Sequence, residues 1–238
     1  MQNGKAIRLP SFSRAQGGNI GVRPHQPRDG ALVGSDPNIG VLISGRGSNL
    51  QALIDAVASG RLRARIAIVI ANRADAGGLQ RARTAGIETL TIPHRDFPSR
   101  DAFEQVLVRE LRARDVRLVC LAGFMRLLGP TFLDAFPNAT LNIHPSLLPS
   151  FPGVDAQRQA WEYGTKLAGA TVHLVTGELD GGPIVLQRAV DVHDDDTPES
   201  LAARILEVEH QIYPEAVGLV LQKGWTIDGR RFRRAKED

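Results

Sequence analysis

The stretch LNIHPSLLP places an amide and an imidazole two residues apart, at Asn142 and His144. Residues two apart on a strand point to the same face, so both side chains can reach one ligand atom. Pro145 follows directly and ends the strand beside this pair. Together the amide and the imidazole can donate two hydrogen bonds to a single carbonyl oxygen. This spacing indicates chemistry at a carbonyl group, whereas a histidine standing alone is more often structural.

An acidic partner for the imidazole is available in the turn ELDGGP, at Asp180. A carboxylate beside an imidazole stabilises its protonated form and so raises its pKa. Gly181 and Gly182 leave Asp180 uncrowded and able to reach a neighbour. An Asp-Gly pair by itself indicates an ordinary hairpin turn, so Asp180 is a catalytic candidate only because of the Asn-His motif.

A glycine-rich loop, SGRGSN over 44–49, lies between a predicted strand and a predicted helix. Its glycines allow a tight turn, and the helix N-terminus offers free N–H groups to an anion. The dinucleotide fingerprint is incomplete, because its third glycine is Leu50 and its acidic residue is replaced by Asn72. No G-K-[ST] follows, so it is not a Walker loop either. The loop indicates a phosphate monoester site, and the alternative is a Ser/Asn cap on an ordinary helix.

The elements that must position these residues alternate between strand and helix. Apolar runs predict strands over 38–44, 64–72, 87–92, 117–123 and 139–143, and helical spacing predicts helices over 48–59, 77–85 and 99–114. Gly86 is expected to close the second of these helices. Such alternation predicts an α/β fold with a mainly parallel sheet and helices on both faces.

The C-terminal part of the chain predicts an antiparallel extension of this sheet. Strands over 170–176 and 183–190 are separated by a short turn, a spacing that suits a hairpin. A long helix is expected over 198–221, with Thr197 as its N-cap and Pro198 at its first position.

Charge and composition exclude several classes of protein. The formal net charge of +3 is carried by residues 1–37, so the rest of the chain is neutral. A neutral body argues against nucleic-acid binding, which needs a concentrated basic face. No apolar run is long enough for a membrane span. The single cysteine, Cys120, lies in an apolar run, which predicts a buried thiol and fits a reducing, cytoplasmic compartment.

Three further segments carry expectations of their own. Residues 1–37 lack apolar periodicity and are expected to be a disordered extension, followed by one catalytic domain over 38–230. The basic end, 231–238, is expected to be a frayed, solvated tail. The acidic run Asp194 to Asp196 is expected to be solvated rather than a metal site, and His173 to be packed within its strand or exposed at its edge.

Five blocks in order resemble one family. SGRGSNL, LAGFMRLL, LNIHPSLLPSFPG, ELDGGP and EHQIYP resemble the phosphoribosylglycinamide formyltransferases, which are folate-dependent enzymes of purine synthesis. The resemblance covers residues 38–230 and implies a Rossmann-like formyltransferase fold. It also implies that 10-formyltetrahydrofolate is the formyl donor and that the partner is a small phosphorylated acceptor.

The resemblance assigns roles position by position. The catalytic residues are Asn142, His144 and Asp180; the acceptor is bound by Gly47, Ser48, Asn49 and Glu209; and the folate is contacted by Arg100, Met125, Arg126, Leu127, Leu128, Asn142, Thr176, Gly177, Glu178, Leu179 and Asp180. The acceptor amine attacks the formyl carbon, and Asn142 and protonated His144 stabilise the resulting oxyanion. Each such donor is worth about 3 kcal/mol.

The resemblance leaves alternatives open. A 10-formyltetrahydrofolate hydrolase has the same trio with water as the acceptor, but the phosphate loop favours a phosphorylated acceptor. A nucleotide-binding module would explain the loop and leave the trio without a purpose. The scheme requires no metal, and the protein is expected to be a monomer or homodimer without nucleic-acid or membrane partners. Gln157 stands where the family often has a histidine, so a second imidazole near that loop is in doubt.

Overall fold

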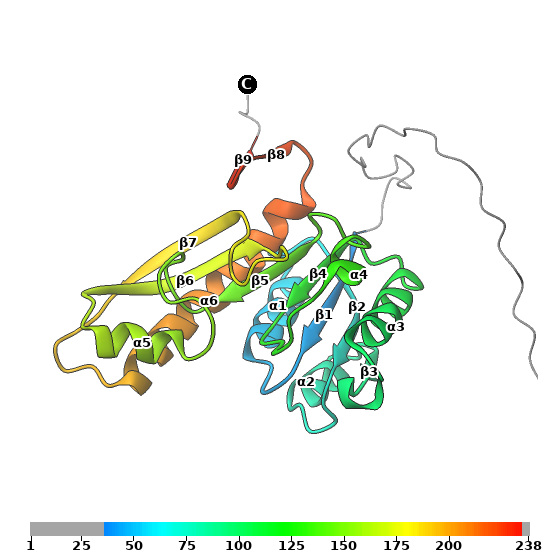
Figure 1. The fold of residues 1–238 in the computed structure, drawn as a ribbon, viewed down its shortest axis with the longest axis horizontal. Coiled ribbons are helices and arrows are strands. Elements are labelled where there is room, and N and C mark those ends of the chain that lie inside the picture. The colour runs from blue at the N-terminus through cyan, green and yellow to red at the C-terminus, as the bar shows by residue number, and fades with distance from the viewer. Residues whose placement is uncertain (1–35, 235–238) are drawn as a thin grey trace, which may run out of the picture. The chain divides into compact units, whose positions relative to one another are not determined.

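The computed structural model describes residues 36–234, and these build one nine-stranded sheet with helices on both faces (Figure 1). The strand order is β3-β2-β1-β4-β5-β6-β7-β9-β8. The strands are β1 (Asn38–Ile43), β2 (Arg65–Ala71), β3 (Thr89–Thr91), β4 (Leu118–Leu121), β5 (Thr140–His144), β6 (Leu167–Leu174), β7 (Ile184–Asp191), β8 (Trp225–Asp228) and β9 (Arg231–Arg234). The first five pair in parallel, and β6 and β7 extend the sheet in antiparallel fashion. The predicted fold class is confirmed.

The helices fall into two groups according to the sheet face they cover. They are α1 (Ser48–Ala58), α2 (Gly78–Thr84), α3 (Arg100–Arg112), α4 (Pro130–Leu133), α5 (Ala156–Tyr163) and α6 (Pro198–Leu221), with a 3-10 turn over His94–Asp96. Apolar residues of α1, α2, α5 and α6 form one core cluster with one face of the sheet. Those of α3 and α4 form a second cluster on the opposite face.

The alternation of side chains along β1 explains this division. Val41 and Ile43 belong to the cluster under α1 and α6, whereas Leu42 belongs to the cluster under α3. All three are fully buried, as expected for a central parallel strand covered on both faces. Cys120, in the neighbouring strand β4, is also fully buried, which confirms the prediction for this thiol.

Local signals set the helix ends that were predicted from the sequence. The Thr197 hydroxyl accepts a hydrogen bond from the Ser200 N–H, and the Ser200 hydroxyl accepts one from the Thr197 N–H. This reciprocal cap fixes the start of α6 at Pro198, as predicted. Gly86, at φ +68°, follows α2 in the left-handed conformation that commonly ends a helix.

The basic C-terminal end differs from the prediction. Residues 231–234 were expected to fray, but they form β9, paired with β8 in a hairpin. The rings of Trp225 and Phe232 lie 5.1 Å apart and pack against the core, which anchors the hairpin while its arginines stay exposed. The basic run gave little sign of this strand, because Phe232 is the single apolar residue of β9.

The acidic run before α6 is only partly solvated, which corrects another expectation. Asp194 and Asp195 are exposed, but Asp196 is buried. Its carboxylate accepts hydrogen bonds from the Arg204 guanidinium and the Ser200 hydroxyl, so it serves as a structural acid at the start of α6. The expected extension over 1–37 falls, apart from its last two residues, outside the described residues, as do residues 235–238. Within the described range no helix is long and apolar enough to cross a membrane.

Candidate active site

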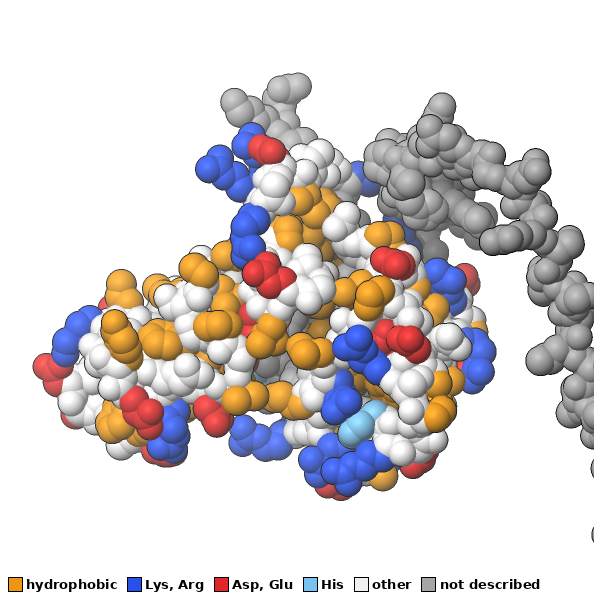
Figure 2. Space-filling view, in the orientation of Figure 1, with side chains coloured by type: hydrophobic (Ala, Val, Ile, Leu, Met, Phe, Trp, Pro, Cys, Tyr) orange, Lys and Arg blue, Asp and Glu red, His pale blue; other side chains and the backbone are white. Residues whose placement is uncertain are grey.

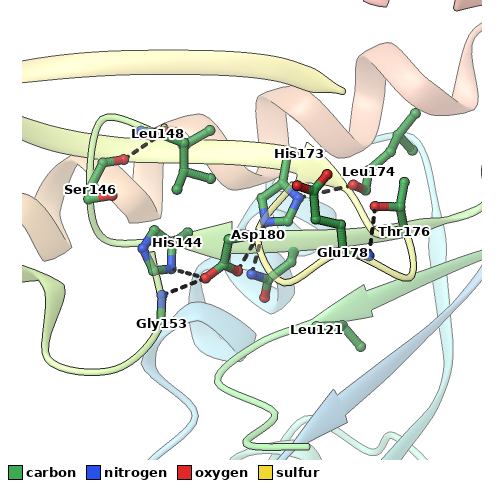
Figure 3. A network of polar contacts seen from close by, with 12 residues as sticks. Leu121, His144, Ser146, Leu148, Gly153, His173, Leu174, Thr176, Glu178 and Asp180 are labelled. Atoms are coloured by element: carbon green, nitrogen blue, oxygen red, sulfur yellow. Dashed lines mark hydrogen bonds and ion pairs between the residues drawn. The ribbon is translucent and has the colours of Figure 1, made fainter. Parts of the chain in front are cut away.

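The candidate site lies where β5 ends and where the turn between β6 and β7 returns to it (Figure 3). Asn142 and His144 are two residues apart on β5, and Asp180 stands in the β6–β7 turn. β6 pairs antiparallel with β5, so that Asn142 faces His173 and His144 faces Thr171. This pairing brings residues more than thirty positions apart in the chain into one polar network.

His144 is almost fully buried, and both of its ring nitrogens face acceptors. Nδ1 lies 3.5 Å from the Asp180 carboxylate, and Nε2 lies 2.8 Å from the carbonyl oxygen of Phe151. A neutral ring has only one N–H to donate, whereas the protonated ring donates from both nitrogens. Each ring nitrogen of His144 therefore has an oxygen acceptor within reach.

Asp180 is held from several sides. It adopts a left-handed conformation, with φ at +48°, and one carboxylate oxygen accepts the backbone N–H of Gly153 at 2.8 Å. Burial alone would raise the pKa of Asp180. The contacts with His173 and Gly153 and the nearby charge of His144 outweigh burial and hold this pKa below its ordinary value. The carboxylate thus keeps its negative charge beside His144.

His173 is the member of this network that sequence reasoning missed, because a histidine within a strand suggested only packing. Its Nδ1 lies 3.0 Å from the Leu174 carbonyl oxygen, so in the neutral ring this nitrogen carries the proton. Its Nε2 lies 3.2 Å from the Asn142 amide nitrogen and 3.6 Å from an Asp180 carboxylate oxygen. His173 could have been assigned to the site only if the pairing of the 139–143 strand with the 170–176 strand had been known, and the sequence pattern does not give that pairing.

The glycine loop after β1 is shaped by close backbone contacts. Gly47 has φ +72°, and a Cβ there would lie 2.6 Å from the Cα of Gly78 in α2. Only glycine fits this position, both for its conformation and for the approach of α2. The guanidinium of Arg81 donates to the carbonyl of Arg46 and so holds the loop from the same side.

Behind this loop, Asn49 and Glu209 form a buried pair. The Asn49 amide donates to the Glu209 carboxylate at 2.6 Å, while the Asn49 carbonyl oxygen has no hydrogen-bond partner. Burial raises the pKa of Glu209 to about 7, although the bond from Asn49 acts against that shift. The structure thus brings Asn49 at the start of α1 together with Glu209 from α6.

A cavity of about 280 Å³ runs along the outer face of α1 from Ser48 towards Arg61, with Arg81 and His210 on its walls. It contains none of the residues of the Asn142 network. Its lining carries both signs of charge, because Asp55 contributes to it together with Arg61 and Arg81. The polar network at the end of β5, and not this cavity, is therefore the candidate site.

The segment expected to line the folate pocket is an exposed apolar strip beside the site. Met125 and Leu127 are 71% and 62% exposed, and Leu179 in the β6–β7 turn is 54% exposed, whereas Leu128 is buried. Hydrophobic side chains gather over the middle of the face drawn in Figure 2. Exposed apolar groups of this size commonly mark a ligand or partner surface.

The other expected folate contacts flank this strip. The Arg100 guanidinium lies against Gly129, next to Leu128. Arg126 is exposed. In the β6–β7 turn, the Glu178 N–H donates weakly to the Thr176 hydroxyl, and the Glu178 carboxylate pairs with Arg230 at 3.2 Å. Gly177 is exposed in the same turn.

Residue 157, where the chain departs from the family pattern, is a half-buried glutamine in the second position of α5. The imidazole that joins the Asn142 network comes instead from His173 on β6. Among residues 36–234, no group of three His, Cys, Asp or Glu side chains is arranged to hold a metal ion.

Comparison with known proteins gives consistent matches. The formyl transferase family model matches residues 37–217. The phosphoribosylglycinamide formyltransferase of Escherichia coli is 47% identical over 193 residues, covering 81% of this chain and 88% of that protein. The trifunctional purine biosynthetic protein adenosine-3 of Drosophila melanogaster is 46% identical over 185 residues, covering 77% of this chain but 14% of that protein. Among solved structures, glycinamide ribonucleotide transformylase 1 from Symbiobacterium toebii aligns with a TM-score of 0.83 and 54% identity, covering 87% of this chain and 99% of that one.

Proposed function

The chain belongs to the formyl transferase family, among its phosphoribosylglycinamide formyltransferases, and we propose that it transfers the formyl group of 10-formyltetrahydrofolate to the amine of 5-phosphoribosylglycinamide. This is a step of de novo purine synthesis. The observation that carries the proposal is the donor pair Asn142 and His144, held at the end of β5 by His173 and Asp180. Such a pair suits a carbonyl oxygen that becomes negative.

The reaction begins with attack of the acceptor's amine nitrogen on the formyl carbon. The C=O bond becomes a C–O⁻ bond, and the nitrogen gains a positive charge. Asn142 donates one amide N–H to His173 and has a second available for the oxyanion. Protonated His144 supplies the other donor, and the charge of Asp180 favours its protonated form.

His144 must exchange a partner to reach the oxyanion, because Nδ1 faces Asp180 and Nε2 faces the Phe151 carbonyl. We infer that the formyl oxygen replaces the Phe151 carbonyl at Nε2. The exchange keeps the contact with Asp180, which is the one that stabilises the charged ring. Collapse of the intermediate then breaks the bond to the folate N10, and the amine proton passes to that nitrogen directly or through water.

The acceptor's phosphate and ribose are assigned to the other end of the site. Gly47 and Ser48 present backbone N–H groups at the start of α1, where an anion is favoured. The buried Asn49 and Glu209 offer one unpartnered oxygen and one carboxyl group, which suit sugar hydroxyls. The pteridine and benzoyl parts of the folate are assigned to the apolar strip around Met125, with Arg100 and Arg126 near its charged tail.

Further parts of this proposal concern the molecule as a whole. We propose one catalytic domain over 38–230, active as a monomer or homodimer, whose sheet is continued to Arg234 by β9. We also propose a cytoplasmic location, because a single cysteine cannot form a disulfide within the chain, and this fits a reducing compartment.

The test separates transfer from hydrolysis of the same folate. Purified protein is mixed with 10-formyltetrahydrofolate, with and without 5-phosphoribosylglycinamide, and release of tetrahydrofolate is followed. Transfer predicts turnover only with the acceptor present and one formylated acceptor per folate consumed. Equal turnover without the acceptor would show the hydrolase instead.

A further inference from the structure

Glu104 is a fully buried carboxylate in the middle of α3, far from the Asn142 network in sequence. Burying a charged group is costly unless hydrogen bonds replace its water. One Glu104 oxygen accepts the backbone N–H of Gly129 at 2.7 Å, and the other accepts that of Phe132 at 3.2 Å. Both carboxylate oxygens of Glu104 therefore accept hydrogen bonds from the backbone around the start of α4.

These two bonds fix the backbone directly after the apolar strip. Gly129 is the N-cap of α4 and follows Leu128, the last residue expected to line the folate pocket. The first N–H groups of a helix have no partner within it, so Glu104 supplies an acceptor that the N-cap glycine cannot. The segment Met125–Leu128 is held at its other end by the Met125 N–H, which donates to the Ser44 hydroxyl.

The same carboxylate also lies beside Arg100, one helical turn earlier on α3. The Arg100 Nε is 3.7 Å from Glu104. The guanidinium lies flat against Gly129, where a Cβ atom would stand 3.0 Å from it. Glu104 thus contacts both Gly129, which directly follows the Met125–Leu128 segment, and the arginine that packs on Gly129.

We propose that Glu104 is a positioning residue for the folate, which holds Arg100 and the Met125–Leu128 segment in one fixed relation. This inference rests on the proposed function. Arg100 comes from α3, and the segment comes from the loop after β4. Glu104 pairs with Arg100 and hydrogen-bonds the N–H of Gly129, the residue that directly follows the segment. A purely structural acid would stabilise α4 without affecting how tightly the folate binds.

The main test is Glu104→Gln, which keeps the size of the side chain but turns one acceptor into a donor that faces a backbone N–H. We expect the KM for 10-formyltetrahydrofolate to rise about 10-fold, as loss of one hydrogen bond to a charged group allows. The kcat and the KM for 5-phosphoribosylglycinamide should stay within about twofold. Glu110→Gln is the matched control, since Glu110 lies on the same helix and its ion pairs are with Arg109 and Arg114, away from the loop after β4.

Gly129→Ala tests the same idea without altering Glu104. The backbone of Gly129, at φ −95° and ψ −175°, suits alanine, so the new methyl group mainly displaces the Arg100 guanidinium. We expect a similar rise in the KM for the folate and little change in the melting temperature. An unchanged folate KM in both variants, with a lower melting temperature for Glu104→Gln, would overturn the positioning role.

Calorimetric titration with tetrahydrofolate separates this inference from the proposed function. Weaker binding to Glu104→Gln than to the Glu110→Gln control supports the positioning role even if no acceptor is formylated. Equal binding to both, in a protein that does transfer the formyl group, overturns the positioning role and leaves the function standing.

Discussion

Asp180 and Glu209 both carry carboxylates that are largely shielded from solvent near the proposed substrates, yet their pKa values shift in opposite directions. Asp180 touches His144, His173 and the N–H of Gly153, and its pKa is lowered. Glu209 has one hydrogen bond, from Asn49, and burial raises its pKa to about 7. At the formyl-transfer end the charged carboxylate is therefore surrounded by partners. At the acceptor end a single hydrogen bond offsets only part of the cost of burying the Glu209 carboxyl group.

The difference indicates how the two ends work. A catalytic network that must stabilise a short-lived oxyanion gains from being fixed in advance. A binding site can contain buried polar groups with too few hydrogen-bond partners, because a ligand that binds only the folded state supplies the missing partners and stabilises the fold. Removing each carboxylate in turn should therefore give opposite results.

The largest effect is expected for Asp180→Asn. Without its charge, protonated His144 is no longer favoured, and kcat should fall on the order of 10³-fold. The KM for 5-phosphoribosylglycinamide should stay nearly unchanged, because Asp180 lies at the other end. Asp194→Asn, which changes an exposed aspartate paired with Lys166, is the control for steady-state kinetics. A loss of less than fivefold in Asp180→Asn would contradict its role.

Glu209→Gln should instead make the protein more stable and weaken binding of the acceptor substrate. A carboxyl group whose pKa is raised by folding contributes fully to the stability of the fold only below its unfolded pKa, near 4.5. That stability is lost as the pH rises through the folded-state pKa, about 7, because the buried group must then ionise. At pH 8 the glutamine variant should gain about 3 kcal/mol in unfolding free energy, with no gain at pH 4.5.

Urea unfolding at both pH values measures this gain in unfolding free energy. In steady-state kinetics, the KM of the same variant for the acceptor should rise at least tenfold. A variant whose stability difference from the wild type is the same at pH 4.5 and pH 8 would show that Glu209 does not titrate in this range.

A smaller loss is expected for His173→Phe. The phenyl ring keeps the bulk, but the partner of the Asn142 amide and one contact of Asp180 disappear. Loss of one buried hydrogen bond costs about 1.4 kcal/mol, which corresponds to a tenfold lower kcat. Rapid-quench measurement of the transfer step isolates this effect from product release. An unchanged transfer rate would remove His173 from the catalytic network.

The smallest effect is expected at Arg230, which pairs with Glu178 on the same turn as Asp180. Both side chains are mostly exposed, and exposed pairs contribute about 0–1 kcal/mol. Arg230→Gln should therefore change the melting temperature and kcat very little. A loss of kcat comparable to that of Asp180→Asn would mean that the whole turn, and not the buried carboxylate, sets the rate.

The sequence predicted the elements that depend on local pattern. The strand period placed Asn142 and His144 on one face, and the Thr197 cap located the start of α6. The contacts that depend on strand order were not predictable from spacing. His173 joins the site only because β6 pairs with β5 in one register, and Asp180 was paired with His144 from family resemblance. Phe151 and Gly153 contribute backbone groups, which leave no trace in residue type.

The contrast between the two carboxylates can be measured directly by carbon-13 NMR of protein labelled at its Asp and Glu carboxyl carbons, with Asp180→Asn and Glu209→Gln used for assignment. In the unliganded protein Glu209 should titrate near pH 7, and Asp180 below the ordinary carboxyl range. Addition of 5-phosphoribosylglycinamide should move the Glu209 titration and leave that of Asp180 in place. Titration of both groups in the ordinary carboxyl range, unaffected by the acceptor, would contradict the division of the site into a preformed end and a ligand-stabilised end.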